Sequence, residues 1–276
     1  METLTSACVT QVIAPRPADS HKGQFGRILI IGGNEHFGGA AIMAASAAVH
    51  AGAGLTTVAC APCNHAALHA RLPEAMVLPY DGARLRHTVP EADVVAIGPG
   101  LGTNETAQEI LAVTLANLTA TQALILDGSA LTMIAQTGLR VTHRKTVWTP
   151  HQMEWQRLSG LAIADQTPAA NASAARTLPG TVVVKSHRTQ IHAPEASFVN
   201  PIGTPAQATG GTGDTLVGIL AAFIGQFGYT TAAINAAVYT HSAIAEELAA
   251  TQYVALPTRV IAALPTYMAR AAANRL

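Results

Sequence analysis

The feature of this sequence that most limits its possible folds is a repeated order of apolar strand, glycine turn and helix. Residues 27–31 (RILII) form a continuous apolar run, the pattern of a strand buried on both faces, and Gly32 and Gly33 end it. The expected strands are residues 27–31, 55–60, 92–97, 123–126, 147–148 and 181–185, with 189–193 as a hairpin partner of the last. The expected helices are residues 40–51, 106–118, 213–225, 231–250 and 258–273. Because strands that alternate with helices are joined by crossover connections, this order predicts an α/β fold: a mostly parallel central sheet with helices on both faces.

The expected strands also indicate where a ligand would bind. Nearly every glycine-rich or polar cluster of the sequence follows directly after one of them. In open parallel sheets ligands bind at the carboxyl ends of the strands, where such clusters meet. No linker, low-complexity tract or repeat of fixed period interrupts the order, so the 276 residues are expected to form one domain.

Charge and hydropathy argue against two classes of protein. The chain has 16 Lys plus Arg against 16 Asp plus Glu, and aromatic residues make up only 4%, which is unlike a nucleic-acid binder. No apolar run reaches the ~18 residues that span a bilayer, and residues 1–20 do not have the pattern of a signal peptide, so no membrane association and a cytoplasmic location are expected. Only 12% of the residues are charged, which leaves little to coat a monomer and favours a homo-oligomer. An alanine-rich composition without quaternary meaning would look the same.

The strongest candidate for a functional site is the segment ATGGTGDTLVGI at residues 208–219. Its glycines allow the backbone to turn amide groups inward, and the helix that follows adds the positive end of its dipole, which together make an anion site. Asp214 lies in the first turn, where a carboxylate would repel a phosphate. Its position suits a general base that takes a proton from a hydroxyl so that the oxygen can attack phosphorus. The alternative is a capping aspartate that stabilises its own helix.

GGTGD followed by an apolar helix resembles the anion hole of ribokinase-like enzymes, and the rest of the chain resembles one branch of them, the ADP/ATP-dependent NAD(P)H-hydrate dehydratase family. The matching motifs follow in family order and span about residues 21–220. They are HKGQFGRILIIGG at 21–33, Gly38-Gly39-Ala40-Ala41 with AGAGL at 51–55, GPGLG at 98–102, Thr149-Pro150-His151 with Glu154, Lys185 with Thr189, and ATGGTGD at 208–214. Together these motifs are highly specific, although none of them is so alone.

The resemblance implies a ribokinase-like fold, with residues 1–20 as an N-terminal extension and residues 21–276 as a single dehydratase domain. It implies a lyase, a hydro-lyase that repairs nicotinamide nucleotides. The S-form of NADH or NADPH hydrate would be dehydrated to NADH or NADPH, with ADP as the phosphoryl donor, Mg²⁺ as a cofactor, and AMP and phosphate as the other products. The implied type is the bacterial ADP-dependent one without the fused epimerase domain. A homotetramer, and a separate epimerase that interconverts the hydrate epimers, are expected on the same ground.

Motif match also implies a role for individual residues. Asp214 is expected to be the catalytic base. The residues expected to contact the hydrate are Ala40, Gly102, His151 and Asp214. The residues expected to contact the adenine nucleotide are Lys185, Ser186, His187, Arg188, Thr189, Gly211, Thr212 and Gly213. The backbone amides of 211–213 would hold the transferring phosphoryl group. No residue is assigned as a metal ligand.

The sequence departs from the family pattern at three places. Residues 186–188 read Ser-His-Arg, without the usual glycine after the lysine. Residues 127–129 read Asp-Gly-Ser where the family has Asp-Ala-Asp, and residues 152–153 read Gln-Met where Pro-Gly is common. These changes affect donor preference more than the catalytic base.

Two other functions remain as alternatives. A small-molecule kinase of the same superfamily, acting on a vitamin-precursor alcohol, would share the anion hole but not the HKGxxG and TPHxxE elements. A nucleotide sensor or redox module would rest on Cys60 and Cys63, a Cys-x-x-Cys pair at the end of an expected strand, and on residues 186–188. His241, in the segment AAVYTHSAIAEEL, is interpreted as a helix-packing residue.

Overall fold

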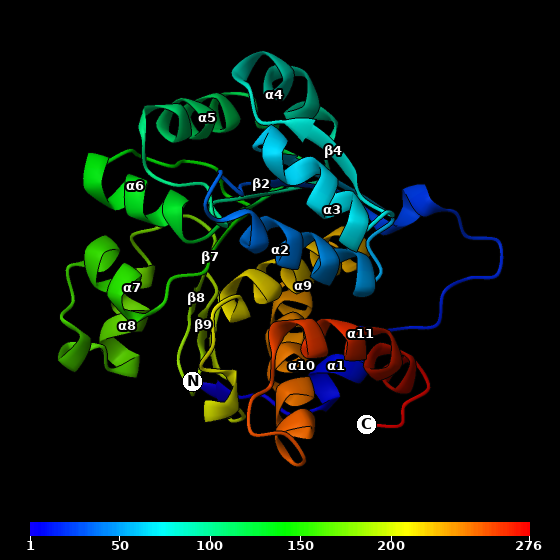
Figure 1. Cartoon of the computed structure of the whole chain (residues 1–276). Helices are drawn as coiled ribbons and strands as arrows, with labels where there is room; N and C mark the ends of the chain where they lie inside the picture. The colour runs from blue at the N-terminus through cyan, green and yellow to red at the C-terminus, as the bar shows by residue number, and fades with distance from the viewer.

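One ten-stranded sheet runs through the molecule (Figure 1). The computed structural model describes residues 1–276. The strands are β1 Glu2–Thr3, β2 Arg27–Ile31, β3 Leu55–Cys60, β4 Met76–Pro79, β5 Val94–Ile97, β6 Ala123–Leu126, β7 Thr146–Trp148, β8 Thr181–Val184, β9 Gln190–His192 and β10 Ser197–Val199. The α-helices are α1 Ala7–Thr10, α2 Gly38–His50, α3 His65–Arg71, α4 Gly82–Thr88, α5 Glu105–Ala116, α6 Ser129–Thr137, α7 Gln152–Ser159, α8 Pro168–Ala175, α9 Thr212–Phe227, α10 Thr231–Ala249 and α11 Pro257–Ala272.

The order of the strands in the sheet is β1-β10-β9-β8-β7-β6-β5-β2-β3-β4. Strands β2 to β8 all lie parallel to one another, and β9 is antiparallel to both β8 and β10. The expected mostly parallel sheet is therefore confirmed, and so is the hairpin partner of the strand at 181–185. Because parallel strands run in one direction, the loops after β2, β5, β6, β7 and β8 all leave the same edge of the sheet.

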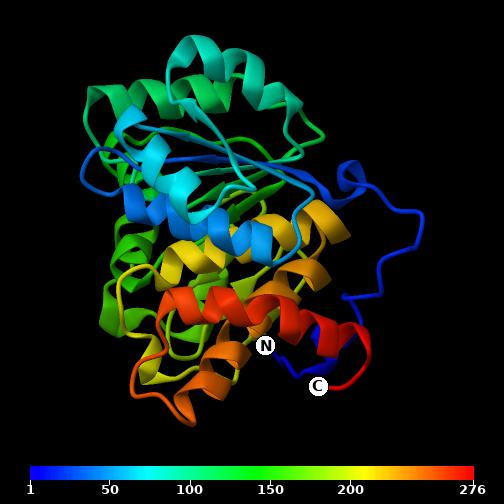
Figure 2. The same ribbon diagram turned by 45° about the vertical axis from the view of Figure 1, so that its right-hand side comes forward.

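Helices cover both faces of the sheet, as the views in Figures 1 and 2 show. Along β2, Ile28 and Ile30 belong to one apolar core, and Leu29 and Ile31 belong to the other. The first core lies between the sheet and helices α2, α9, α10 and α11, and the second lies between the sheet and helices α4 to α8. Burial on both faces explains why this strand is a continuous apolar run and not an alternating one.

Helices α2 and α9 pack against each other at very short range. A Cβ atom placed on Gly218 of α9 would lie 2.0 Å from the carbonyl oxygen of Ala44 and 2.7 Å from the Cβ of Ala47, both in α2. Only glycine on one helix and alanine on the other allow this approach. The alanine-rich composition of α2 therefore has a packing role, because it lets α9 start at the carboxyl edge of the sheet.

The sequence pattern does not predict the helices α1, α4, α6, α7 and α8 or the strands β1, β4 and β10. These elements are short, and most of them lie toward the periphery, where polar and exposed residues dilute the periodic signal. At the N-terminus, β1 pairs with β10 at the edge of the sheet, and Leu4, Val9 and Ile13 are buried in the first core. None of the helices combines the length and the apolar character that crossing a bilayer requires.

Candidate functional site

The loops after β2 and β5 are joined into one wall of the carboxyl edge. The backbone N–H of Gly33 donates to the carbonyl of Pro99 at 2.8 Å, and the N–H of Asn34 donates to the carbonyl of Gly100 at 2.7 Å. Gly100 has a φ of +61°, and a Cβ there would lie 3.0 Å from the Cβ of Ala40. Ala40, at the start of α2, therefore lies beside the GPGLG loop.

Gly102, at the end of that loop, is held by Ser129, one of the residues at which the sequence departs from the family pattern. Its backbone N–H donates to the hydroxyl of Ser129 at 2.9 Å. The φ of Gly102 is +85°, and a Cβ there would lie 2.7 Å from the side-chain nitrogen Nδ2 of Asn34. Gly128 precedes the serine with a φ of +51° and caps α6. The Gly-Ser pair thus has a structural task here, since it turns the chain into α6 and anchors the loop after β5.

A buried ion pair lies at the centre of the edge, where β6 and β8 end. The ammonium Nζ of Lys185 is 2.6 Å from Oδ1 of Asp127, and the hydroxyl of Thr149 donates to the same oxygen at 2.7 Å. Burial by itself lowers the pKa of Lys185, but the nearby carboxylates, Asp127 foremost, outweigh it and raise the pKa above its ordinary value. Lys185 is therefore a permanent positive charge in the site.

Asp214 faces this pair from the first turn of α9. Burial, and then the charge of Asp127, raises the pKa of Asp214 to about 6, against the opposing effect of Lys185. A Cβ on Gly213 would lie 3.2 Å from the ammonium of Lys185, so the lysine head rests on the backbone where α9 begins. Two carboxylates and one ammonium therefore share the space in front of this helix.

The start of α9 has the form of an anion site. Gly211 is its N-cap, with a φ of +96°, and the hydroxyl of Thr212 closes the loop by donating to the carbonyls of Gln207 at 2.8 Å and Thr209 at 3.0 Å. The first amides of a helix have no partner within it and carry the positive end of the dipole. The amides of the first turn of α9 are therefore available to phosphate oxygens.

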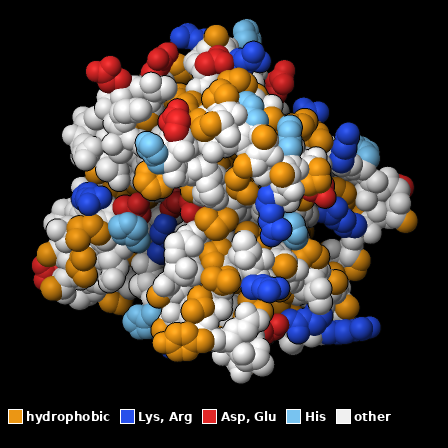
Figure 3. Space-filling view, in the orientation of Figure 1, with side chains coloured by type: hydrophobic (Ala, Val, Ile, Leu, Met, Phe, Trp, Pro, Cys, Tyr) orange, Lys and Arg blue, Asp and Glu red, His pale blue; other side chains and the backbone are white.

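Most of the residues expected to contact the nucleotide line one cavity of about 610 Å³. Its lining includes His151, Lys185, Ser186, His187, Arg188, Thr189, Thr212 and Gly213. The cavity is not lined by Ala40, Gly102, Gly211 or Asp214. Figure 3 shows acidic, basic and histidine side chains close together at a hollow over the ends of β7 and β8.

The loop 186–188 forms its own turn without the usual glycine. The hydroxyl of Ser186 accepts the backbone N–H of Arg188 at 3.1 Å, and the hydroxyl of Thr189 donates to the carbonyl of Ser186 at 3.0 Å. The guanidinium of Arg188 donates to the carbonyl of His187 at 3.0 Å. The serine therefore supplies a bond that fixes the loop, and the basic side chain of Arg188 stays exposed beside the cavity.

His241 lines the same cavity, although the sequence interpretation treats it as a helix-packing residue. It is buried in α10, its Nδ1 is 3.5 Å from the amide nitrogen of Gln207, and burial lowers its pKa to about 4. Gln207 and Ser242 line the cavity as well. The sequence signal for His241 and Ser242 is the polar run Thr240-His241-Ser242 inside an otherwise mostly apolar stretch of α10.

The cysteine pair lacks the properties of a redox site. Cys60 is buried at the end of β3, and burial raises the pKa of its thiol to about 11. A reactive cysteine has a depressed pKa, because the thiolate is the reactive form. Cys63 is exposed and lies in a short 3₁₀ turn, so the structure disfavours the redox alternative.

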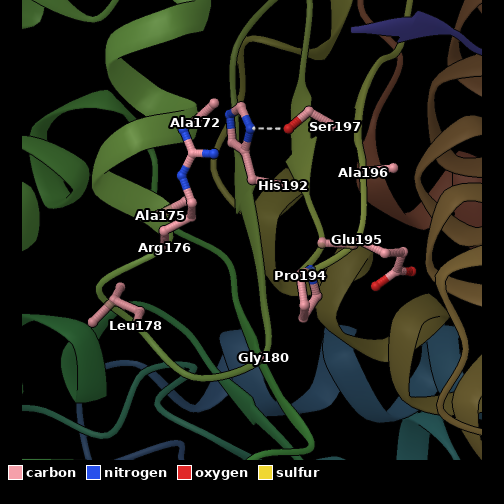
Figure 4. Close-up of a pocket in the computed structure, with 11 residues that line it drawn as sticks. Ala172, Ala175, Arg176, Leu178, Gly180, His192, Pro194, Glu195, Ala196 and Ser197 are labelled. Atoms are coloured by element: carbon pink, nitrogen blue, oxygen red, sulfur yellow. Dashed lines mark hydrogen bonds between the residues drawn. The ribbon is translucent and has the colours of Figure 1, made fainter.

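A second cavity, of about 360 Å³, lies beside the β9–β10 hairpin (Figure 4). His192 is buried there, with Nδ1 3.0 Å from the hydroxyl of Ser197, and burial followed by the charge of Arg176 lowers its pKa to about 4. Both ring nitrogens have partners within the protein. None of the residues expected in the site lines this cavity.

The sequence of this chain is similar to a described protein family and to characterised relatives. Residues 28–266 match the family model described as NAD(P)H-hydrate dehydratase. The chain is 53% identical over 271 residues to the ADP-dependent (S)-NAD(P)H-hydrate dehydratase of Lactiplantibacillus plantarum, covering 98% of both chains.

Two solved structures are similar throughout. A ribokinase-like superfamily protein from Enterococcus faecalis is 50% identical, with a TM-score of 0.96, over 98% of this chain and 96% of that one. An ADP/ATP-dependent NAD(P)H-hydrate dehydratase from Bacillus subtilis, co-crystallised with ATP and Mg²⁺, is 28% identical, with a TM-score of 0.85, over 98% of both chains. The expected ribokinase-like fold is therefore confirmed.

Proposed function

This chain belongs to the NAD(P)H-hydrate dehydratase family, and from this premise we propose that it restores NADH and NADPH from the S-form of their hydrates with ADP as phosphoryl donor. The enzyme is then a hydro-lyase of nicotinamide nucleotide repair. The observation that carries the proposal is a carboxylate with a raised pKa, Asp214, at the amide-rich start of α9 and beside the ammonium of Lys185.

The reaction proceeds in two stages because hydroxide is a poor leaving group. The hydroxyl oxygen of the hydrate attacks the β-phosphorus of ADP, the bond to AMP breaks, and the hydroxyl proton passes to Asp214. The C–O bond then breaks as the lone pair of the ring nitrogen forms a C=N bond, and phosphate departs. Loss of a proton from the neighbouring ring carbon completes the dihydropyridine ring, so the atoms of one water end in phosphate and a proton.

Each charged group of the site has a task in this scheme. A pKa of about 6 leaves Asp214 ionised at neutral pH and yet basic enough to take a proton. The ammonium of Lys185 and the amides of residues 211–213 stabilise the charge on the transferring phosphoryl group. The tight packing of Gly211 against Met43 and Pro257 holds the loop in position for this.

The two ligands would occupy two parts of the carboxyl edge. ADP would lie in the 610 Å³ cavity, held by Lys185, Ser186, His187, Arg188, Thr189, Thr212 and Gly213. The hydrate would lie between the wall that contains Ala40 and Gly102 and the side chain of His151, which lines the ADP cavity as well and would therefore stand where the two ligands meet. In this arrangement Asp214, in the first turn of α9, would lie between the two ligands, where the phosphoryl group passes from one to the other.

The residues at this edge fit Mg²⁺ bound together with ADP. Asp127 uses only Oδ1 for its bonds to Lys185 and Thr149, which leaves Oδ2 as an acceptor. No group of three or more His, Cys, Asp or Glu side chains is arranged to hold a metal. This suits Mg²⁺, which is commonly held by one or two carboxylates, water and phosphate oxygens. When bound, Mg²⁺ neutralises charge on the phosphates, and Asp127 is the residue that would hold it.

An assay of the purified protein tests the function and the base together. With NADH hydrate, ADP and Mg²⁺, the absorbance of reduced nicotinamide should return, and ADP should be a better donor than ATP. Asp214→Asn should lower the rate at least about 100-fold, because general bases contribute 10²–10⁴. Asp165→Asn, a carboxylate exposed on the surface, should not change it. A phosphorylated product that accumulates without absorbance would indicate a kinase instead.

We also propose that the protein is a homo-oligomer, with a tetramer favoured by the family, and that a separate epimerase supplies the S-form. The small charged fraction of 12% supports the oligomer. Exposed apolar side chains such as Phe37, Tyr253 and Leu256 support it as well. Sedimentation equilibrium of the purified chain should give a mass several times 28.4 kDa, and a mass of one chain would contradict the proposal.

A further inference from the structure

His151 is the N-cap of α7, and its ring is fixed by the helix that it caps. Its Nδ1 accepts the backbone N–H of Met153 at 3.1 Å and that of Glu154 at 3.3 Å. A nitrogen that accepts two N–H groups carries no proton, so in the neutral ring the proton lies on Nε2. Burial, and next the charge of Lys185, lowers the pKa of His151, which keeps the ring neutral at neutral pH.

Glu154 binds the backbone of His151 and lies close to its ring. Its Oε2 accepts the backbone N–H of His151 at 2.8 Å, and its Oε1 lies 3.5 Å from Nε2 of the same residue. Glu154 is only 6% exposed, whereas 54% of the His151 side chain is exposed toward the site. The carboxylate therefore anchors the backbone of His151 and lies beside the ring edge that carries the Nε2 proton, at a distance that leaves this proton available to a ligand.

We propose that Glu154 is a positioning residue, which together with the first turn of α7 presents His151 to the hydrate as a neutral hydrogen-bond donor through Nε2–H. The proposal rests on the proposed function. It identifies the group that His151 meets as an oxygen acceptor of the hydrate. It also assigns the proton transfers elsewhere, because the basic nitrogen of His151 is occupied by the helix and cannot accept a proton from the substrate.

The surroundings of Glu154 support a carboxylate with a task beyond capping. The groups that affect it are Lys185 and Asp127 from the site, Arg157 one turn along α7, and the backbone of His151. Burial is the largest effect and raises the pKa of Glu154 to about 6. A buried carboxylate costs stability that an amide at the same position would not. A residue that only capped the helix would not need this charge.

The chain contains a second cap of the same form, which suggests the variant to use. His21 caps a 3₁₀ helix with Nδ1 accepting the N–H of Gly23 at 3.2 Å, and Gln24 accepts the backbone N–H of His21 at 2.9 Å. Glutamine therefore suffices for the backbone bond of the cap. Glu154→Gln should keep this bond, but it places an amide N–H₂ near Nε2–H of His151, where donor faces donor.

The experiment compares wild type, Glu154→Gln and the control Asp81→Asn, which makes the same carboxylate-to-amide change at the cap of α4. Histidine-selective ¹⁵N NMR, with the His151 signals identified from a His151→Gln variant, should show Nδ1 unprotonated and Nε2 protonated in wild type. In Glu154→Gln this signal should shift or broaden, the KM for the hydrate should rise about 10-fold, and the KM for ADP should stay unchanged. The control should match wild type in these three readouts.

Two results would overturn the proposal: a wild-type His151 that carries its proton on Nδ1, or a Glu154→Gln variant that keeps both the His151 signal and the KM of wild type. Thermal unfolding of the variant checks that its fold is intact. If wild type converts no hydrate at all, the proposed function fails, and the NMR comparison still decides whether Glu154 positions the ring.

Discussion

Three charges in a small volume determine the behaviour of the site. Asp127 and Asp214 are carboxylates, and the ammonium of Lys185 lies between Asp127 and the start of α9. Asp127 forms the close ion pair with the ammonium, at 2.6 Å. The ammonium stabilises the charged form of Asp214 less, so burial and the charge of Asp127 raise the pKa of Asp214 to about 6. The two carboxylates therefore have different roles: Asp127 pairs with Lys185, and Asp214 is available to accept a proton.

The raised pKa of Asp214 predicts a cost in stability that its replacement removes. A carboxyl whose pKa rises from 3.8 to about 6 on folding binds protons more tightly in the folded state, so folding loses stability as pH rises through this window. Asp214→Asn should therefore be more stable than wild type at pH 7.5, by up to about 3 kcal/mol, and equal to it near pH 4. Urea unfolding at both pH values measures this. Equal stabilities at pH 7.5 would mean that the pKa is not raised.

The same pKa predicts the pH dependence of activity. Because the base must be ionised, kcat/KM for the hydrate should rise with pH through about 6.

The buried pair of Lys185 and Asp127 predicts a pattern for single and double variants. Lys185→Met leaves the carboxylate of Asp127 buried without its cation, which should cost about 3–5 kcal/mol of stability. Adding Asp127→Asn removes that charge and should restore most of the loss. Activity should not return in the double variant, because the cation for the phosphoryl group is still absent. A double variant no more stable than Lys185→Met would show that the pair is not coupled.

Among the elements, α9 has the largest effect on the site because it carries both the anion loop and Asp214. Its position depends on α2, which it approaches so closely that only small residues fit. Two short helices also position site residues through their first residues. The Gly128-Ser129 pair at the start of α6 anchors Gly102, and His151 is the N-cap of α7. The geometry of the proposed site is thus set where helices begin.

Gly218→Ala tests the close packing of α9 on α2. The added methyl would lie 2.0 Å from the carbonyl of Ala44, so α9 must move, and a loss of about 1–3 kcal/mol is expected together with a fall in activity. Gly39→Ala, the same change in α2 where no atom lies within 4 Å, should be neutral or slightly stabilising. Melting temperatures of the two variants measure the contrast, and equal values would contradict the packing account.

For the whole molecule, the open carboxyl edge of the sheet gives the two ligands a shared surface. The cavity of about 610 Å³ is large enough for a nucleotide, and the residues that line it come from β-strand loops, α9 and α10. A ligand that binds there ties these parts together and should stabilise the fold by mass action.

ADP should therefore raise the melting temperature of the free protein. At 100 times its Kd the gain is about 2.7 kcal/mol, or roughly 5–10 °C for a chain of this size. Arg188→Ala should reduce the shift if the guanidinium contacts the nucleotide, and Arg259→Ala, an exposed arginine of α11 outside the cavity lining, serves as control. Equal shifts for all three proteins would remove Arg188 from the nucleotide site.

Most of the central sheet and the motif residues can be identified from the sequence alone, because strands buried on both faces are continuous apolar runs and the motifs follow them. The runs at 27–31, 55–60 and 123–126 match β2, β3 and β6 to the residue. The sequence also indicates the anion loop at 208–214, because its glycines and the helix that follows are recognisable from neighbouring residues alone.

The surroundings of the anion loop, in contrast, depend on contacts between segments that are far apart in the sequence. The ion pair of Lys185 with Asp127 joins residues 58 positions apart, and His241 reaches the cavity from α10, a helix that follows the anion loop in sequence but shares no motif with it. Neither follows from a local pattern, since contact and burial depend on which loops the sheet order brings together. The environment of Asp214 depends on the same contacts: burial and the charge of Asp127 raise its pKa, and Asp127 comes from a distant segment.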